Sequence, residues 1–173
     1  NYVLKKYWKT KDKKINYRKL HRIICESDKP VIYIGKGVNN YSQELKEFAE
    51  KYNIPVTSTI HSMGTFNENH KLSLGFLGMH GFPCANYSIQ NSDLIIALGS
   101  RFDDRTTGNI KKYAPLCKNI IYVNICEDDF GRVIKSTNER KIYEIKLDCG
   151  VFLNEINKIK LYYKINRDDW LNK

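Results

Sequence analysis

Short apolar runs alternate along this chain with segments of helical periodicity, and no other feature restricts its fold as strongly. Runs rich in Ile, Val, Leu and Tyr, bounded by Gly, Pro, Asn or Asp, are typical of buried strands. The predicted strands are 31–34, 56–59, 94–98, 119–125 and 142–147. Apolar residues spaced three and four apart predict helices between them. The predicted helices are 16–27, 42–52, 83–92 and 151–163, with shorter helical turns near 108–113 and 130–135.

Strands that alternate with helices form a parallel sheet, because each crossover helix packs on a face of that sheet. The crossovers of such sheets are right-handed. The sequence therefore predicts an α/β fold, a Rossmann-like parallel sheet of five or six strands with helices on both faces. The 173 residues suffice for one such domain with a sizeable core, which we place at 16–165.

The positive charge of the chain is concentrated at its N-terminal end. Of a net charge of +10, +8 comes from residues 1–22, which hold nine Lys or Arg against one acid, Asp12. We interpret 1–15 as a solvated basic linker rather than a phosphate-binding surface, and we expect no nucleic-acid partner. Residues 166–173 are interpreted as a tail toward a further domain. Because the sequence begins with Asn1, we expect a piece of a longer polypeptide.

The composition disfavours three classes of protein. No apolar run approaches the ~20 residues of a membrane span, so we expect no membrane contact. The five cysteines are scattered without a C-x-x-C pair, which argues against a disulfide framework and against a thiolate metal site. The four histidines also lack metal-ligand spacing, so no metal site is predicted.

The strongest site candidate follows the apolar run 94–98. A glycine turns the chain there, and the next residues include Arg101, Asp103, Asp104 and Arg105. In a parallel sheet, ligands bind at the carboxyl ends of the strands. The planar fork of arginine suits a phosphate or a carboxylate. We therefore favour an anion-binding site at this strand end over a cluster of ion pairs that only neutralises itself.

Each of three other segments allows two alternative interpretations, one as a ligand-binding segment and one as a structural segment. Gly35-Lys36-Gly37 follows the first strand, where it could bind phosphate or form an ordinary turn, since Asn40 replaces the third glycine of G-x-G-x-x-G. The three glycines of 75–81 surround His80, which suggests contact with a cofactor or a loop with positive φ angles. The acids 127–129 suit a ribose or a helix cap. Because no nucleophile–base pair emerges, these residues predict a cofactor pocket without chemistry of its own.

The segments 30–37, 74–81, 85–93 and 101–108 resemble the central domain of acetohydroxyacid synthase (acetolactate synthase), a thiamine-diphosphate enzyme family. The resemblance extends over about 30–156. It implies that this domain binds FAD across the carboxyl ends of its strands. It also implies that the flanking domains hold thiamine diphosphate and Mg²⁺. No catalytic residue is then expected in this chain, and the isolated domain is expected to be inactive.

The resemblance further implies which residues contact cofactor and substrate. The residues that match FAD contacts of the family are Gly35, Gly37, Thr59, Ile60, His61, Gly78, Met79, His80, Gly99, Ser100, Arg101, Asp103, Arg105, Asn124, Ile125, Asp148 and Cys149, the last four on the adenosine side. Met79, Asp104 and Arg105 match positions lining the substrate channel, where Arg105 would engage the carboxylate of a 2-keto acid. Herbicide-type inhibitors would block the entrance of that channel. Three features depart from the family. Lys36 stands where a glycine is usual, and it could reach a phosphate or obstruct the approach of the backbone to one. The segment 124–148 is longer than usual, and the family's upstream FAD arginine has no secure counterpart in the basic N-terminal segment.

As a member of this family, the whole enzyme would condense two pyruvates, or pyruvate and 2-ketobutyrate, in branched-chain amino-acid biosynthesis. Its expected partners are the flanking domains, further copies in a homodimer or tetramer, and optionally a regulatory subunit. The expected location is a plastid or mitochondrion in a eukaryote and the cytoplasm in a bacterium. Two other hypotheses remain: a stand-alone NAD- or FAD-binding module without catalysis, and a domain of an NAD-dependent oxidoreductase. The incomplete glycine motif and the missing acid–base residue count against the oxidoreductase.

Overall fold

A single sheet of parallel strands organises the computed structural model, which describes residues 15–131 and 140–172. Each pair of neighbouring strands is parallel, and their order is β3-β2-β1-β4-β5-β6. The strands are β1 (Pro30–Ile34), β2 (Val56–Ser58), β3 (Ser73–Phe76), β4 (Leu94–Leu98), β5 (Asn119–Asn124) and β6 (Lys141–Lys146). The prediction of an α/β fold with a parallel sheet of five or six strands is confirmed.

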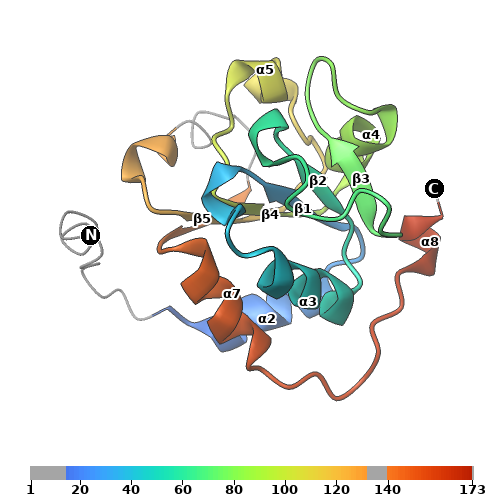
Figure 1. Ribbon diagram of the computed structural model, residues 1–173, viewed down its shortest axis with the longest axis vertical. Helices are drawn as coiled ribbons and strands as arrows, with labels where there is room; N and C mark the ends of the chain where they lie inside the picture. The colour runs from blue at the N-terminus through green and yellow to red at the C-terminus, as the bar shows by residue number, and fades with distance from the viewer. Residues whose placement is uncertain (1–14, 132–139, 173) are drawn as a thin grey trace.

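The strand order reverses between β1 and β4 (Figure 1). The chain runs outward from β1 through β2 to β3, then returns to place β4 on the other side of β1. β1 and β4 are paired up to their last residues, Ile34 and Leu98. The connections that leave these two strands diverge, and in open α/β sheets ligands bind in the crevice that this divergence creates.

Helices cover both faces of the sheet, as predicted (Figure 1). On one side lie α2 (Tyr17–Glu26), α3 (Ser42–Tyr52) and α7 (Cys149–Asn157). On the other side lie α4 (Pro83–Asn91) and α8 (Asp168–Leu171). The short α5 (Asp104–Thr107) follows β4, and the 3-10 turns are η1 (Lys36–Val38), η2 (Ile60–Ser62), η3 (Ile110–Lys112) and η4 (Glu127–Asp129). No helix among the described residues is both long and apolar enough to span a bilayer.

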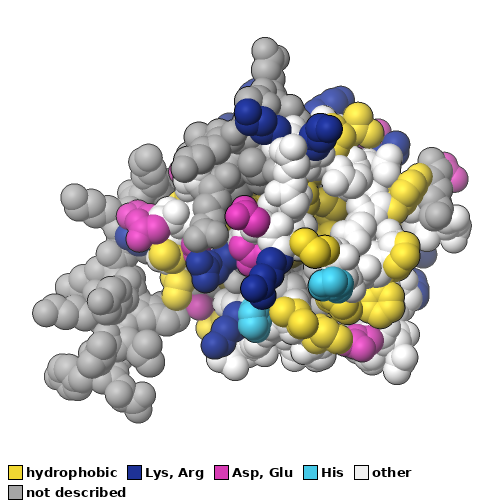
Figure 2. All heavy atoms as spheres, turned by 90° about the horizontal axis from the view of Figure 1, so that it is seen from above, with side chains coloured by type: hydrophobic (Ala, Val, Ile, Leu, Met, Phe, Trp, Pro, Cys, Tyr) yellow, Lys and Arg dark blue, Asp and Glu magenta, His cyan; other side chains and the backbone are white. Residues whose placement is uncertain are grey.

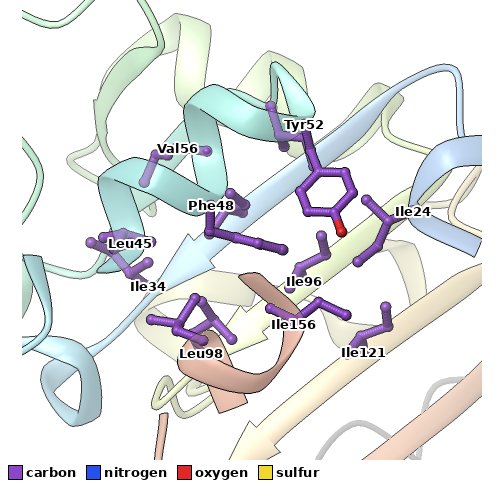
Figure 3. Packing of buried hydrophobic residues seen from close by; sticks show 14 of the residues in the cluster. Ile24, Ile34, Leu45, Phe48, Tyr52, Val56, Ile96, Leu98, Ile121 and Ile156 are labelled. Carbon is purple, nitrogen blue, oxygen red and sulfur yellow. The ribbon is translucent and has the colours of Figure 1, made fainter. Parts of the chain in front are cut away.

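Successive strand residues supply two separate cores, because side chains alternate across a sheet. Ile34 of β1 and Phe48 of α3 belong to one cluster (Figure 3). Ile32 of β1 belongs to the same cluster. Val31 and Tyr33 of the same strand belong to the cluster on the α4 side. Every residue of β1 and of β4 is buried. Continuous apolar runs of this kind are expected of strands covered on both faces, which explains why the sequence marks these two so clearly.

Two of the longer elements differ from the prediction, and the sequence did not predict the short helices α5 and α8. The sixth strand is β3, which the sequence did not mark because Ser73 and Gly75 interrupt its apolar character and its residues are only half-buried. The last helix is α7 rather than 151–163. It begins earlier because the Asp148 carboxylate accepts hydrogen bonds from the first backbone N–H groups of the helix, and it ends at Asn157. Of the turn predicted at 130–135, all but the first two residues lie outside the described residues.

The segment after α7 returns beneath the amino ends of the strands and packs there. The buried guanidinium of Arg167 donates to the carbonyls of Ile24 and Ser27 at the end of α2, and to that of Tyr52 at the end of α3. The indole Nε1 of Trp170 donates to Pro30 O at 3.1 Å. The described part of the predicted tail 166–173 therefore contributes to the stability of the domain, whereas the predicted basic linker 1–15 lies almost entirely outside the described residues.

Candidate functional site

A cavity of about 720 Å³ lies at the carboxyl ends of β1, β2, β3 and β4. Its volume falls in the range of about 300–1,000 Å³ that is usual for small-molecule and cofactor sites. It is lined by Gly35, Lys36, Thr59, Ile60, His61, Phe76, Leu77, Met79, His80, Gly99, Ser100, Arg101, Asp103, Asp104, Arg105 and Thr106. The fold thus brings together, in one cavity, most of the residues for which the sequence predicted contact with a cofactor or substrate.

The loops after β1 and β4 touch each other backbone to backbone at the strand-order reversal. A Cβ atom on Gly35 would lie 2.4 Å from Gly99 O, and one on Gly37 would lie 2.8 Å from Gly99 Cα. Gly37 N donates to Gly99 O at 3.2 Å, and Gly99 itself has a φ of +58°. Packing of one loop on the other therefore requires glycine at these positions. Gly37 does not line the cavity, whereas Gly35 and Gly99 present backbone without side chains to it.

Of residues 99–106, all but Phe102 line the cavity. Phe102 is buried, with its ring centroid 5.3 Å from that of Tyr33 and 5.1 Å from that of Tyr122. This anchor directs the neighbouring side chains outward. Asp103 forms the N-cap of α5, because its Oδ1 accepts hydrogen bonds from Thr106 N at 3.2 Å and from Thr106 Oγ1 at 3.1 Å.

The charges of this segment do not neutralise one another. Arg101 Nε donates to Asp129 Oδ1 at 3.3 Å, although 62% of the Arg101 side chain is exposed. The guanidinium of Arg105 and the carboxylate of Asp104 make no ion pair or hydrogen bond within the described residues. The alternative of a self-neutralising cluster is therefore wrong, and Arg105 is available to an anion. Asp129, from the second acidic cluster, also accepts a hydrogen bond from Asn124.

The loop after β3 is held against α5. Met79 N donates to Arg105 O at 3.0 Å, and a Cβ atom on Gly78 would lie 2.8 Å from that same oxygen. The amide of Asn86 accepts from Gly78 N at 3.2 Å and donates to Gly78 O at 3.0 Å. Gly78 thus fixes the loop without lining the cavity, while Met79 and His80 remain exposed at its wall.

Among the buried polar side-chain atoms of the described cavity wall, the Ser100 hydroxyl lacks a partner. Ser100 is 1% exposed, and its Oγ makes no hydrogen bond in the described structure. Its carbonyl, by contrast, accepts from Tyr122 Oη at 2.8 Å and from Asn124 Nδ2 at 3.2 Å. Buried polar atoms are almost always satisfied, so the unpaired hydroxyl indicates a ligand or an ordered water at this position.

The four residues predicted for the adenosine side do not line the cavity. They lie beside it, at the carboxyl ends of β5 and β6. The Asn124 amide is occupied within the protein, and the Asp148 carboxylate caps α7. The Cys149 side chain is buried. Burial raises the pKa of its thiol to about 12, so the thiol stays protonated at neutral pH. Ile125, in contrast, is 62% exposed and offers an apolar surface.

Four lining residues escaped the sequence prediction as contacts: Lys36, Phe76, Leu77 and Thr106. Phe76 and Leu77 would follow from recognising β3, because they lie at its carboxyl end. For Lys36 the sequence left open whether it reaches a phosphate or obstructs the backbone, and the structure places it in the cavity wall. No group of three or more His, Cys, Asp or Glu side chains arranged to hold a metal ion occurs among the described residues.

The face of the molecule that carries α5 is chemically mixed. Figure 2 shows it from above relative to Figure 1, with basic, acidic, histidine and hydrophobic side chains close to one another. Among the exposed hydrophobic residues, Ile60 is 65% and Met79 is 76% exposed, and both line the cavity. The cavity can therefore contact both the charged and the apolar parts of one ligand.

Comparison with known proteins connects this site to a family. The model of the family described as "Thiamine pyrophosphate enzyme, central domain" matches residues 17–156. The chain is 38% identical over 162 residues to "Acetolactate synthase, chloroplastic" of Arabidopsis thaliana, covering 84% of this chain and 24% of that protein. It is 38% identical over 174 residues to the "Acetolactate synthase large subunit" of Buchnera aphidicola subsp. Schlechtendalia chinensis, covering 95% and 30%.

A third relative is the "Acetolactate synthase catalytic subunit, mitochondrial" of Saccharomyces cerevisiae, which is 41% identical over 125 residues, covering 66% of this chain and 18% of that protein. The chain spans less than a third of the length of each of these curated relatives. The matched range contains all six strands and the whole cavity. The chain belongs to the family of thiamine pyrophosphate enzyme central domains.

Proposed function

We propose that this chain is the central domain of an acetolactate synthase catalytic subunit and that its cavity binds FAD. The observation that carries the proposal is a cavity at the reversal of strand order, in a chain whose relatives are named acetolactate synthases. In doubly wound sheets, dinucleotides bind at this place.

The residues present fit a flavin dinucleotide. Gly35 and Gly99 offer bare backbone that a diphosphate can approach, and Ser100 Oγ is a buried hydroxyl without a partner. Arg101 presents a largely exposed guanidinium, and Ile60 presents an apolar side chain. A ligand with an anionic centre and aromatic ends satisfies all of these groups. In the proposed reaction the flavin supplies no net oxidation or reduction, so its role there is structural.

The adenosine half would extend from the cavity toward β5 and β6. The exposed side chain of Ile125 would pack on the adenine ring. Asn124 and Asp148 already use their side chains within the protein, so a role for them depends on atoms that the internal hydrogen bonds leave available. Cys149 is buried and would contribute through its backbone.

The substrate channel of the whole enzyme would run past Met79, Asp104 and Arg105. The guanidinium of Arg105 has no partner among the described residues, which suits the carboxylate of pyruvate or of 2-ketobutyrate. Thiamine diphosphate and Mg²⁺ would be held by flanking domains, in a homodimer or tetramer with or without a regulatory subunit. We therefore expect the isolated chain to form no acetolactate. Relatives named chloroplastic and mitochondrial suggest those compartments for a eukaryotic source, and the large subunits of bacteria suggest the cytoplasm.

Titration of the purified chain with FAD, followed by flavin fluorescence, tests the proposal. We expect saturable binding that Arg101→Ala weakens about tenfold, the effect of losing one charge-assisted hydrogen bond. Arg22→Ala is the matched control, because Arg22 lies exposed on α2 away from the cavity. Excess NAD should not compete, which separates the proposal from a general dinucleotide module. Equal affinity of wild type and Arg101→Ala, or no binding by the wild type, would contradict it.

A further inference from the structure

Lys36 places a positively charged side chain in the cavity wall, and this charge has no partner among the described residues. Its ammonium group makes no ion pair or hydrogen bond within the described residues, and its side chain is exposed at the cavity wall. Its backbone is fixed, in contrast. It lies between two glycines that pack against Gly99, and its carbonyl accepts from Asn39 N at 3.2 Å. The origin of the side chain is therefore fixed, while its charged end is free to meet a ligand.

The formal charge of the cavity depends on this residue. Apart from Lys36, the described lining residues include two arginines, Arg101 and Arg105, and two aspartates, Asp103 and Asp104. With neutral histidines these four charges cancel, so Lys36 gives the lining a net positive charge; Asp129, which pairs with Arg101, lies outside the lining. A cleft with an excess of one charge attracts ligands of the opposite charge.

The two arginines have different surroundings. Arg101 already pairs with Asp129, so the carboxylate of Asp129 partly offsets the positive charge that Arg101 offers to a ligand. Arg105 is carried by α5, beside the loop that follows β3. Lys36 instead belongs to the loop after β1, which packs on Gly99 and on the backbone of Ser100. Lys36 and Ser100, whose hydroxyl lacks a partner, line the same cavity. An ammonium and a hydroxyl are both donors to phosphate oxygens.

We propose that Lys36 is a specificity residue that binds the diphosphate of the dinucleotide, and that it selects a ligand with this group. The proposal rests on the function proposed above. It adds that Lys36 recognises the diphosphate part of the ligand. Neither the rings of FAD nor the substrate carboxylate is assigned to Lys36. Its effect on affinity should therefore be electrostatic and sensitive to salt.

The test compares FAD affinities of the full chain at low and high ionic strength. We expect Lys36→Met to weaken binding about fivefold at low ionic strength, in keeping with a solvent-exposed charge pair, and by less at high ionic strength. Lys36→Arg should retain most of the wild-type affinity. The matched control is Lys46→Met, because Lys46 is an exposed lysine of α3 that does not line the cavity. Thermal unfolding of the apo proteins should be the same for all variants.

The outcomes separate this inference from the function on which it rests. If the wild type binds FAD and Lys36→Met binds equally well, the role of Lys36 is refuted while the cofactor site stands. A loss of affinity that is identical at both ionic strengths would also refute it, since that result indicates a change in structure rather than in charge. If the wild type does not bind FAD, both the proposed function and the role of Lys36 fail.

Discussion

Gly99→Ala tests whether the loops after β1 and β4 pack as closely as the structure shows. Gly99 has a φ of +58°, and a Cβ atom there would lie 2.5 Å from Gly37 Cα and 2.9 Å from Gly37 N. Both neighbouring atoms belong to the backbone, so no side chain can rotate to relieve the contact. The substitution therefore forces one loop to move away from the other.

The expected loss of stability has two parts. A left-handed φ costs an alanine about 1–2 kcal/mol. Overpacking of a tight contact typically adds about 1–3 kcal/mol. The sum, about 3 kcal/mol, is a large part of the ~5–15 kcal/mol that stabilises an ordinary domain. Gly64→Ala isolates the first part, because Gly64 has a φ of +80° and a Cβ atom there would meet nothing within 4 Å.

Urea denaturation of the two variants measures the difference. We expect Gly99→Ala to lower the free energy of unfolding by at least 1 kcal/mol more than Gly64→Ala, about the least that overpacking adds, with unchanged dependence on urea concentration. Affinity for FAD should also fall in Gly99→Ala, because Gly99 lines the cavity. Equal destabilisation by the two substitutions would refute the close approach of the loops, and with it the requirement for glycine at Gly35 and Gly37.

Other predictions concern the stability of the domain. Arg167→Met leaves three helix-end carbonyls without their buried donor and should cost about 3 kcal/mol in urea denaturation, whereas the exposed Arg22→Met should change stability by less than ~0.5 kcal/mol. Burial raises the pKa of the Cys117 thiol to about 11 and that of Cys149 to about 12, from an ordinary value of 9.0. A thiol whose pKa is raised by folding stabilises the native state fully at a pH below its unfolded pKa, and this contribution is lost as the pH rises toward its folded pKa. Urea denaturation across a pH series should therefore show the free energy of unfolding falling from pH 9 toward 12. In the native protein, a thiol reagent at neutral pH should label exposed Cys84 and spare both of these cysteines.

The sequence best predicts those strands whose residues are buried on both faces of the sheet. The strand 94–98 is predicted with the bounds it has in the structure, because its five apolar residues are buried on both faces and end at a glycine. β3 lies at an edge and is half-buried, so its residues carry no such signal. The early start of α7 depends on the cap that Asp148 provides, which a search for apolar periodicity does not detect.

Tertiary contacts explain what the sequence does not predict of the site. The local pattern of the segment after β4 places it at a strand end, and the fold adds the loops after β1, β2 and β3 around it. Gly35 must be glycine because it packs against Gly99. A local sequence pattern does not predict a contact between residues so far apart in the chain. Likewise, Arg167 meets its partners more than a hundred residues away in the sequence.

Mapping of FAD binding by NMR tests the central claim most directly. In ¹H–¹⁵N spectra of the chain recorded with increasing FAD, we predict saturable shifts of the amides of Gly35, Thr59, Ser100 and Arg101, which line the cavity. The amide of Leu153, on the far side of the sheet in α7, should stay unchanged. Shifts confined to other surfaces, or spectra that FAD does not alter, would contradict the assignment of this cavity as the cofactor site.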